Sequence, residues 1–252
     1  MVRVAPVDYD THGRGYALKR RADPRIAERI LVALGDAKTV LNVGAGAGSY
    51  EPTDRWVLAV EPSATMRAQR GPQAAPCLAG SAESLPLDDG SVDAAMACVT
   101  IHHWADRAGG LAELRRVSRG PVVVFTFELN DLVGWQRDYF AEAIALEQAR
   151  FGTLDEIAAE LGGEVRIERI PTPSDRTDGF FEAFWNRPEA LLDPTVRASQ
   201  SIWELLEPGV EEQIFERLAA DLESGAWDAE HGALREMASY EGALRLVISE
   251  PS

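Results

Sequence analysis

The sequence predicts an α/β fold, a doubly wound seven-stranded and mostly parallel sheet with a helical cap inserted between the last two strands. Short apolar runs alternate with helical patterns up to residue 170, which is the rhythm of strand–helix–strand units. The run 92–99 is apolar almost throughout, as expected of a parallel strand covered on both faces. A helical, proline-interrupted stretch of roughly 70 residues then precedes the last strand.

The composition excludes several classes of protein. A length of 252 residues suits one ordinary domain, and the net charge of −16 without a Lys/Arg run disfavours nucleic acid and anionic membrane as partners. The apolar run 121–127 is too short to span a bilayer, and the N-terminus has no signal-peptide core. Cys77 and Cys98 make neither a disulfide framework nor a metal site. We therefore expect a cytoplasmic monomer or homodimer that binds a small molecule and no metal.

Cap residues and apolar periodicity place the elements. Asp23 and Pro24 are expected to open a helix that Gly35 ends, and Ser63 is expected to cap a second helix. Strands are expected at 39–43, 56–60, 75–79, 92–99, 121–127, 164–170 and 240–249, and further helices at 107–119, 132–150 and 154–161.

We expect one core, residues 1–170 plus 238–252, and one inserted helical cap, residues 171–237. Residues 1–22 are rich in aromatic and charged side chains but have little helical periodicity. They form either a solvated arm or a flap over a bound cofactor. In the flap, Tyr9 and Tyr16 would cover the cofactor, and Arg14 or Arg21 would pair with its carboxylate.

A glycine-rich turn follows the first strand. Glycine permits backbone conformations that a Cβ forbids and lets a ligand lie against the main chain. Glu61, at the end of the second strand, is placed to accept hydrogen bonds from the two hydroxyls of a ribose. The turn departs from the dinucleotide fingerprint, because Ser49 stands at the third small position and no helix follows to receive a pyrophosphate. A nucleoside cofactor is therefore expected; a nicotinamide cofactor and a purely structural turn are the weaker alternatives.

In this order the motifs resemble the class I S-adenosylmethionine-dependent methyltransferases of the ubiquinone/menaquinone-biosynthesis (methyltransferase type 11) group. The resemblance covers residues 7–128 by motif and the rest by topology. It implies a Rossmann-like fold, S-adenosyl-L-methionine as cofactor, and methyl transfer to an O, N or C nucleophile of a small aromatic or hydrophobic molecule in biosynthesis. The residues implied to bind the cofactor are Tyr9, Arg14, Tyr16, Arg21, Asn42, Gly44, Ala45, Gly46, Glu61, Pro62, Ser63, Met66, Ser81, Ala82, Glu83, Cys98 and Val99.

The chain departs from the family pattern at three places. Asn42 stands where an acid that helps anchor the cofactor's ammonium is common, although its amide oxygen still accepts a hydrogen bond. Ser81 stands where many members use Asp to bind the adenine, which shifts that contact to Glu83 or to the backbone. The helix after the glycine-rich turn is nearly absent.

His102 and His103 are the candidate catalytic residues. They follow the fourth strand, at the edge of the sheet where ligands bind, and histidine is a suitable general base near neutral pH. We expect only one of them to face the substrate. The alternative is that neither does chemistry and that transfer relies on proximity. His12 is a second candidate, and His231 is expected at the surface.

The cap is expected to select the substrate. Trp104, Tyr139, Phe181 and Trp185 are the predicted contacts with an acceptor, and Asp178 and Arg187 are weaker polar candidates. The alternative for each cap aromatic is a place in the cap's own core. A protein of another class also stays open, one that binds the cofactor without methylating, such as a sensor or a repurposed cyclase.

Overall fold

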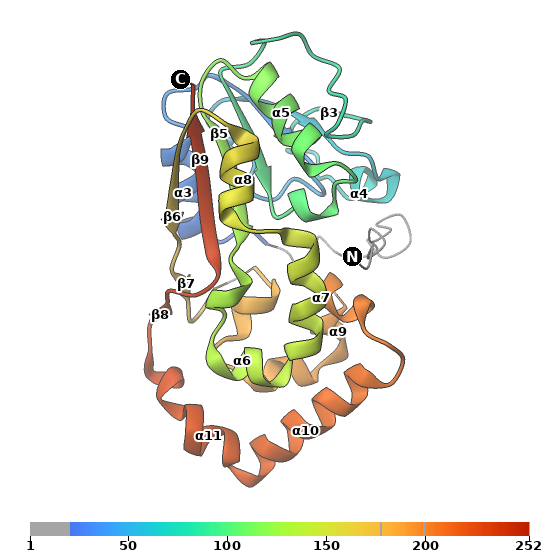
Figure 1. Cartoon of the computed structure of the whole chain (residues 1–252), viewed down its shortest axis with the longest axis vertical. Coiled ribbons are helices and arrows are strands. Elements are labelled where there is room, and N and C mark those ends of the chain that lie inside the picture. Colours follow the sequence, from blue (N-terminus) through green and yellow to red (C-terminus); the bar gives the residue numbers. More distant parts are fainter. Residues whose placement is uncertain (1–20, 177, 199, 252) are drawn as a thin grey trace.

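The computed structural model describes residues 21–176, 178–198 and 200–251. Their main feature is a seven-stranded sheet of order β3-β2-β1-β4-β5-β9-β6 (Figure 1). All neighbouring strands are parallel except β9, which is antiparallel to β5 and to β6. The predicted doubly wound, mostly parallel sheet is confirmed. Its strands are β1 (Thr39–Val43), β2 (Trp56–Val60), β3 (Cys77–Leu78), β4 (Ala94–Cys98), β5 (Val122–Phe127), β6 (Glu164–Arg169) and β9 (Leu244–Glu250).

Alternation of side chains along the strands divides the core into two layers. Val40, Met96 and Phe125 belong to the layer that contains α3 (Pro24–Ala33), whereas Leu41 and Ala97 belong to the layer on the opposite face. That second layer is completed by α5 (Arg107–Val117) and α8 (Leu154–Leu161). Because both faces are covered, the central strands are apolar throughout.

The helices begin at the predicted caps. The side chain of Asp23 accepts a hydrogen bond from the Arg25 amide at the start of α3, where Pro24 is the first helical residue. Ser63 accepts from the Met66 amide at 3.1 Å and opens α4 (Ala64–Ala68). These bonds satisfy amides that have no partner inside a helix.

The predicted helix 132–150 is wrong in its continuity. It consists of α6 (Gly134–Tyr139) and α7 (Ala141–Phe151), and Phe140 between them has the non-helical angles φ −113° and ψ 25°. The Phe140 side chain is fully buried, with Trp203 and Phe215 close to its ring. Because of the break, the Phe140 ring points into an aromatic core, and helical periodicity does not predict this contact.

Strand boundaries also differ from the prediction. The expected strand 75–79 is only two residues long, and the expected strand 92–99 begins at Ala94. The expected strand 240–249 is interrupted, because β8 (Ser239–Tyr240) pairs with β7 (Thr172–Pro173) in a separate two-stranded sheet. This pairing holds together the two chain segments that enter and leave the insertion.

A helical insertion separates β6 from β9, as predicted, but much of it is 3-10 helix. Figure 1 shows it at one end of the molecule with α6 and α7, away from α5 and β3. Trp135 and Phe140 from before the insertion lie in one apolar cluster with Trp203, Phe215 and Trp227 from within it. The boundaries 171–237 stay a prediction. The insertion contains η3 (Phe181–Phe184), η4 (Pro188–Leu192), α9 (Pro194–Arg197), η5 (Ser201–Leu205), α10 (Val210–Ser224), α11 (Ala226–His231) and η6 (Gly232–Glu236).

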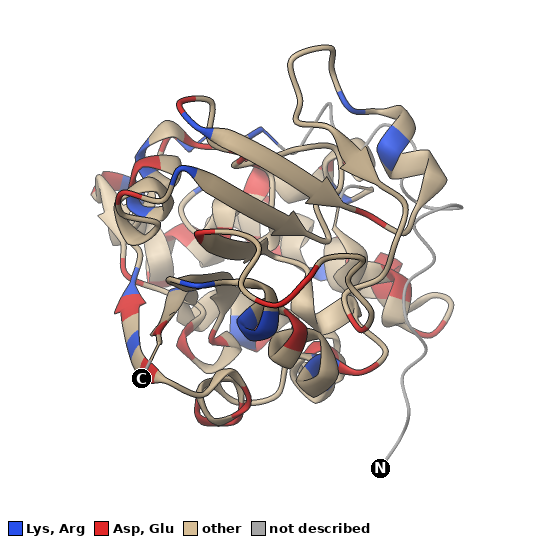
Figure 2. Ribbon diagram, turned by 90° about the horizontal axis from the view of Figure 1, so that it is seen from above, with Lys and Arg blue, Asp and Glu red and all other residues tan. Residues whose placement is uncertain are grey.

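Charged residues are distributed over many elements. Figure 2 shows the basic segments scattered among acidic ones. Within the described ranges, no helix combines the length and the apolar character needed to cross a bilayer.

Candidate functional site

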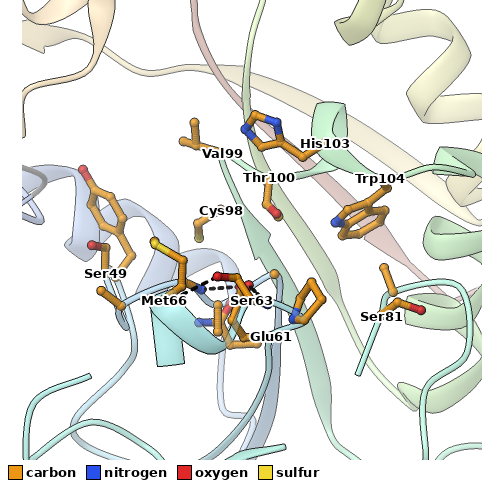
Figure 3. Close-up of a pocket in the computed structure, with 18 of the residues that line it drawn as sticks. Ser49, Glu61, Ser63, Met66, Ser81, Cys98, Val99, Thr100, His103 and Trp104 are labelled. Carbon is orange, nitrogen blue, oxygen red and sulfur yellow. Dashed lines mark hydrogen bonds between the residues drawn. The ribbon is translucent and has the colours of Figure 1, made fainter. Parts of the chain in front are cut away.

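A cavity of ≈ 390 Å³ lies beyond the carboxyl ends of β1, β2 and β4 (Figure 3). We call it the first cavity. Open α/β sheets place their ligands at this edge. Its lining residues are Asn42, Gly44, Ala45, Gly46, Ala47, Ser49, Tyr50, Glu61, Pro62, Ser63, Met66, Ser81, Ala82, Glu83, Cys98, Val99, Thr100, His103, Trp104 and Ala105.

The glycine-rich turn is shaped by its own backbone. Gly44 and Gly46 have φ of 65° and 53°, a region that favours glycine. A Cβ on Gly44 would also collide with the side chain of Thr100, so the main chain of the turn approaches the end of β4 closely. Gly44 and Gly46 line the first cavity without side chains, and we call them the glycine floor.

Glu61 fastens this turn to the end of β2. Its Oε2 accepts the Gly46 amide and its Oε1 accepts the Ser63 amide, both at 2.8 Å. The side chain is 6% exposed and faces the first cavity. Each carboxylate oxygen has a second lone pair, so Glu61 retains capacity to accept hydrogen bonds from a ligand.

Asn42 lines the same cavity and carries a buried acceptor. Its Nδ2 donates to Glu51 at 3.1 Å, and Glu51 forms a buried ion pair with Arg70 at 2.7 Å. An ionised carboxylate only accepts, which fixes the orientation of the amide. The Asn42 Oδ1 atom is left buried with no hydrogen-bond partner in the described part of the chain.

Two residues on the wall of the first cavity have strained backbone. Val99 has φ 53° and Tyr50 has φ 63°, which is unusual for side chains of their size. Such a conformation costs about 1–3 kcal/mol and persists only where the surroundings enforce it. The Val99 amide donates to Phe125, and the Tyr50 hydroxyl donates to Asp178 at 2.9 Å. Burial raises the pKa of the Tyr50 hydroxyl, so it stays protonated.

The adjacent histidines line different cavities. His103 lines the first cavity, and its Nδ1 lies 2.7 Å from Nη2 of Arg150. A guanidinium only donates, so Nδ1 of His103 is the acceptor and its proton lies on Nε2. His103 therefore presents an N–H donor in this arrangement.

His102 packs with its ring stacked on Phe151, with centroids 4.0 Å apart and planes at 13°. It lines a second cavity, of ≈ 60 Å³. Val99 lines both cavities. The described residues of the second cavity are Val99, His102, Phe127, Leu129, Leu132, Glu147, Phe151, Phe180, Phe181, Glu182, Gln200, Ser201 and Ile202.

The structure separates the predicted substrate residues. Trp104 lines the first cavity and Phe181 lines the second. Tyr139 lines neither, and its hydroxyl donates to Asp221. Trp185 also lines neither; it is fully buried, and its ring stacks on that of Tyr240 with centroids 5.6 Å apart.

Every predicted cofactor residue from Asn42 to Val99 lines the first cavity. Arg21 is exposed and does not line it. The predicted Tyr9, Arg14 and Tyr16, and the histidine candidate His12, lie outside the described residues. The sequence did not predict five of the residues that line the first cavity, namely Ala47, Ser49, Tyr50, Thr100 and Ala105. The position of Thr100, directly after the expected apolar strand 92–99, could have predicted that it lines the cavity.

Comparison with known proteins identifies the family. A family model described as methyltransferase domain matches residues 41–124, the segment that forms most of the first cavity. The crystal structure of a putative methyltransferase from an antibiotic biosynthesis pathway of Anabaena variabilis is 31% identical, with a TM-score of 0.85 over 92% of this chain and 98% of that one. The chain belongs to the class I S-adenosylmethionine-dependent methyltransferases.

Further relatives of this methyltransferase agree with that placement. An uncharacterised methyltransferase of Mycobacterium tuberculosis is 32% identical over 182 residues, which span 66% of each chain. A demethylmenaquinone methyltransferase of Mycolicibacterium gilvum is 33% identical over 109 residues, 41% of this chain and 48% of that one. The cyclase SpnF shares the fold at 15% identity and a TM-score of 0.58, so the fold alone does not fix the reaction.

Proposed function

We propose that this methyltransferase moves the methyl group of S-adenosylmethionine to an O, N or C nucleophile of a small, hydrophobic or aromatic molecule. The observation that carries the proposal is the buried Asn42 Oδ1, an acceptor without a partner among the described residues, beside a glycine floor in the first cavity. A buried acceptor left unpaired is unfavourable by about 1–3 kcal/mol, so a donor from a ligand is expected there. The cofactor's ammonium group is such a donor.

The residues of the first cavity fit the parts of this cofactor. Glu61 would accept hydrogen bonds from the ribose hydroxyls, and Asn42 would accept one from the ammonium. The loop of Ser81, Ala82 and Glu83 would contact the adenine. Because the cofactor carries no phosphate, the absence of a helix after the glycine-rich turn is no obstacle.

When bound, S-adenosylmethionine supplies a methyl group already activated on a sulfonium. The protein's task is then to align the acceptor and exclude water. Val99, Thr100 and His103 stand together on one wall of the first cavity, across from Glu61 and Ser63 (Figure 3). They are suited to hold the acceptor against the methyl carbon.

His102 and His103 stay the catalytic candidates. With Arg150 donating to Nδ1, His103 would act through its Nε2–H and orient an acceptor lone pair. To act as a general base at Nε2, it would first have to lose the proton that this contact places there. We therefore propose an orienting function for His103, and the proton of an O or N nucleophile is released to water after the methyl group has moved.

The test is incubation with radiolabelled S-adenosylmethionine and a panel of aromatic hydroxy and amino compounds, with S-adenosylhomocysteine measured as the second product. Transfer that falls in His103→Ala, with unchanged cofactor affinity, supports the proposal. Cofactor binding without transfer to any member of the panel would instead favour a non-methylating protein, such as a sensor or cyclase.

A further inference from the structure

Tyr50 connects the first cavity to the chain segment that leads into η3 of the insertion. The described residues that line the first cavity all lie between Asn42 and Ala105, so none of them belongs to the insertion. Tyr50 is one of these lining residues, and its hydroxyl donates a hydrogen bond to Asp178 at 2.9 Å. The two residues are 128 positions apart in the sequence. One side chain thus reaches from the cavity wall to the insertion.

The hydrogen bond between Tyr50 and Asp178 is buried at both ends. Tyr50 is 6% exposed and Asp178 is 1% exposed. Burial raises the pKa of the Tyr50 hydroxyl, so the hydroxyl remains a donor. A hydrogen bond to a carboxylate is stronger than one between neutral groups, and its removal leaves a buried polar group with one partner fewer. We therefore expect this contact to have a measurable effect.

The Tyr50 ring and the segment after Asp178 also pack on the same side chain. The Tyr50 ring meets the ring of Phe125, in β5, edge to face with centroids 5.4 Å apart. Phe180 meets the same Phe125 ring with centroids 6.5 Å apart. Because protein interiors are close-packed, a shift of Phe180 on Phe125 changes the space that is open to the Tyr50 ring. Packing and the hydrogen bond therefore act together.

The start of α3 takes part in the same contact. The Asp23 amide donates to the Tyr50 hydroxyl oxygen at 3.5 Å. Arg25 forms ion pairs with Asp23 at 2.7 Å and with Asp175 at 2.8 Å, but its side chain is half exposed, so these pairs contribute little. The buried Tyr50 hydroxyl is the stronger connection between α3 and the segment before η3.

The backbone of Tyr50 depends on its surroundings. Its φ of 63° is unfavourable for a residue of this size and persists only where neighbouring groups enforce it. Tyr50 follows the glycine-rich turn, of which Gly44, Gly46 and Ser49 line the first cavity. Loss of the hydroxyl contact would let residue 50 relax, and the turn that faces the cofactor would change shape.

We propose that Tyr50 is a positioning residue, whose hydrogen bond to Asp178 couples the position of the insertion to the shape of the first cavity. Cofactor binding then stabilises the segment 178–184, and this segment in turn supports cofactor affinity. The inference rests on the proposed function for the identity of the ligand. A coupling free energy between two sites is reciprocal, so it can be measured from either side.

Calorimetric titration with S-adenosylhomocysteine measures the coupling from the cofactor side. Tyr50→Phe keeps the ring and removes the hydroxyl, and we expect about fivefold to tenfold weaker binding. Tyr139→Phe is the matched control, because the Tyr139 hydroxyl also donates to a carboxylate, that of Asp221, while Tyr139 lines neither cavity. Equal affinities of wild type and Tyr50→Phe overturn the proposal.

A double-mutant cycle shows whether Tyr50 and Asp178 act through one bond. Asp178→Leu removes the acceptor and should weaken binding about as much as Tyr50→Phe, whereas Asp178→Asn keeps an acceptor oxygen and should lose less affinity. The double variant should bind no more weakly than either single variant. Additive losses contradict the coupling. If Asp178→Leu does not fold, Tyr50→Phe decides by the exchange measurement that follows.

Hydrogen exchange of backbone amides measures the coupling from the side of the insertion. In the wild type, S-adenosylhomocysteine should slow exchange in residues 178–184, although none of them lines the first cavity. In Tyr50→Phe the slowing should be confined to the segments that line this cavity. A merely structural contribution of Tyr50 would speed exchange in the variant equally with and without the ligand, and that result overturns the proposal.

Failure of the coupling is distinguishable from failure of the proposed function. If the wild type does not bind S-adenosylhomocysteine, the proposed function fails, and exchange without ligand still decides the coupling. Tyr50→Phe must then speed exchange both in residues 44–50 and in residues 178–184, and faster exchange in only one segment, or in neither, contradicts the coupling. Normal ligand binding that Tyr50→Phe leaves unchanged defeats only the positioning by Tyr50.

Discussion

Val99 and Tyr50 show what individual residues contribute to the site. Both have a left-handed backbone on the wall of the first cavity, and both are tied to other elements, Val99 to β5 and Tyr50 to Asp178. The sequence carries no signal for either angle, because glycine and asparagine are the residues that predict it. Close contacts within the folded chain hold the two residues in place.

The residues of the cofactor motifs, by contrast, could be predicted. The first cavity gathers the predicted set from Asn42 to Val99, because turns and strand ends fix their positions locally. The prediction of Tyr139 and Trp185 as substrate contacts rests on their aromatic character alone, and neither residue lines either cavity. Burial in a helical layer depends on packing partners far along the chain, which residue type does not specify.

Glu61 tests the cofactor site at this scale. Glu61→Gln removes the charge that strengthens hydrogen bonds to the ribose, and each such bond contributes about 1.5–3 kcal/mol. We expect about tenfold to hundredfold weaker binding of S-adenosylhomocysteine by calorimetry. Glu28→Gln, on the exposed side of α3, is the matched control and binds normally. Equal affinities of the two variants would remove Glu61 from the site.

Glu182 predicts a pH dependence of stability. Burial raises its pKa to about 7 from an ordinary value of 4.5, and this outweighs the opposite effects of Thr172, Ala243, Arg176 and Arg245. Between these values the native state holds a proton that the unfolded chain has released, so stability falls as pH rises through the window.

The contribution of Glu182 to the fall is about 3 kcal/mol between pH 4.5 and 7. Urea unfolding of wild type and Glu182→Gln across this range measures it, because glutamine does not titrate. A difference between the two proteins that stays constant with pH would show that the buried carboxyl does not titrate in this range.

Elements were predicted best where local chemistry defines them. The caps at Asp23 and Ser63 and the apolar strands β1, β2, β4 and β5 follow from side chains within a few residues. The wrong element boundaries lie in segments whose conformation depends on packing against residues far along the chain. The break at Phe140 and the interruption after Tyr240 both serve contacts made with the insertion.

The α7 helix fixes the state of His103 through Arg150. In the wild type, nitrogen-15 NMR of the imidazole should report Nδ1 as an acceptor and the proton on Nε2. Arg150→Met removes the donor, and we expect a mixture of tautomers and a lower kcat. Arg166→Met, on the exposed β6, is the control. An unchanged spectrum in Arg150→Met would mean that another group sets the tautomer.

At the scale of the whole molecule, the insertion and the sheet share one apolar cluster. Phe125 of β5, Trp135 of α6 and Trp203 of the insertion all belong to it. Because the cluster is continuous, we expect the insertion and the sheet to unfold together in one cooperative transition.

Urea unfolding tests this cooperativity. Tryptophan fluorescence reports mainly on the helical end, which contains Trp135, Trp185, Trp203 and Trp227, whereas far-ultraviolet circular dichroism reports on the whole chain. We expect the two transitions to coincide. S-adenosylhomocysteine should shift both to higher urea by the same amount. A separate, earlier fluorescence transition would show that the insertion unfolds on its own.

The central claim is that the first cavity binds a sulfonium nucleoside and not a dinucleotide. Calorimetric titration of the purified protein with S-adenosylmethionine, S-adenosylhomocysteine and NADH tests it most directly. The fold, the glycine floor and Glu61 predict micromolar binding of the two sulfur nucleosides and no binding of NADH. Binding of NADH alone would contradict the assignment of the first cavity and the reaction proposed for it.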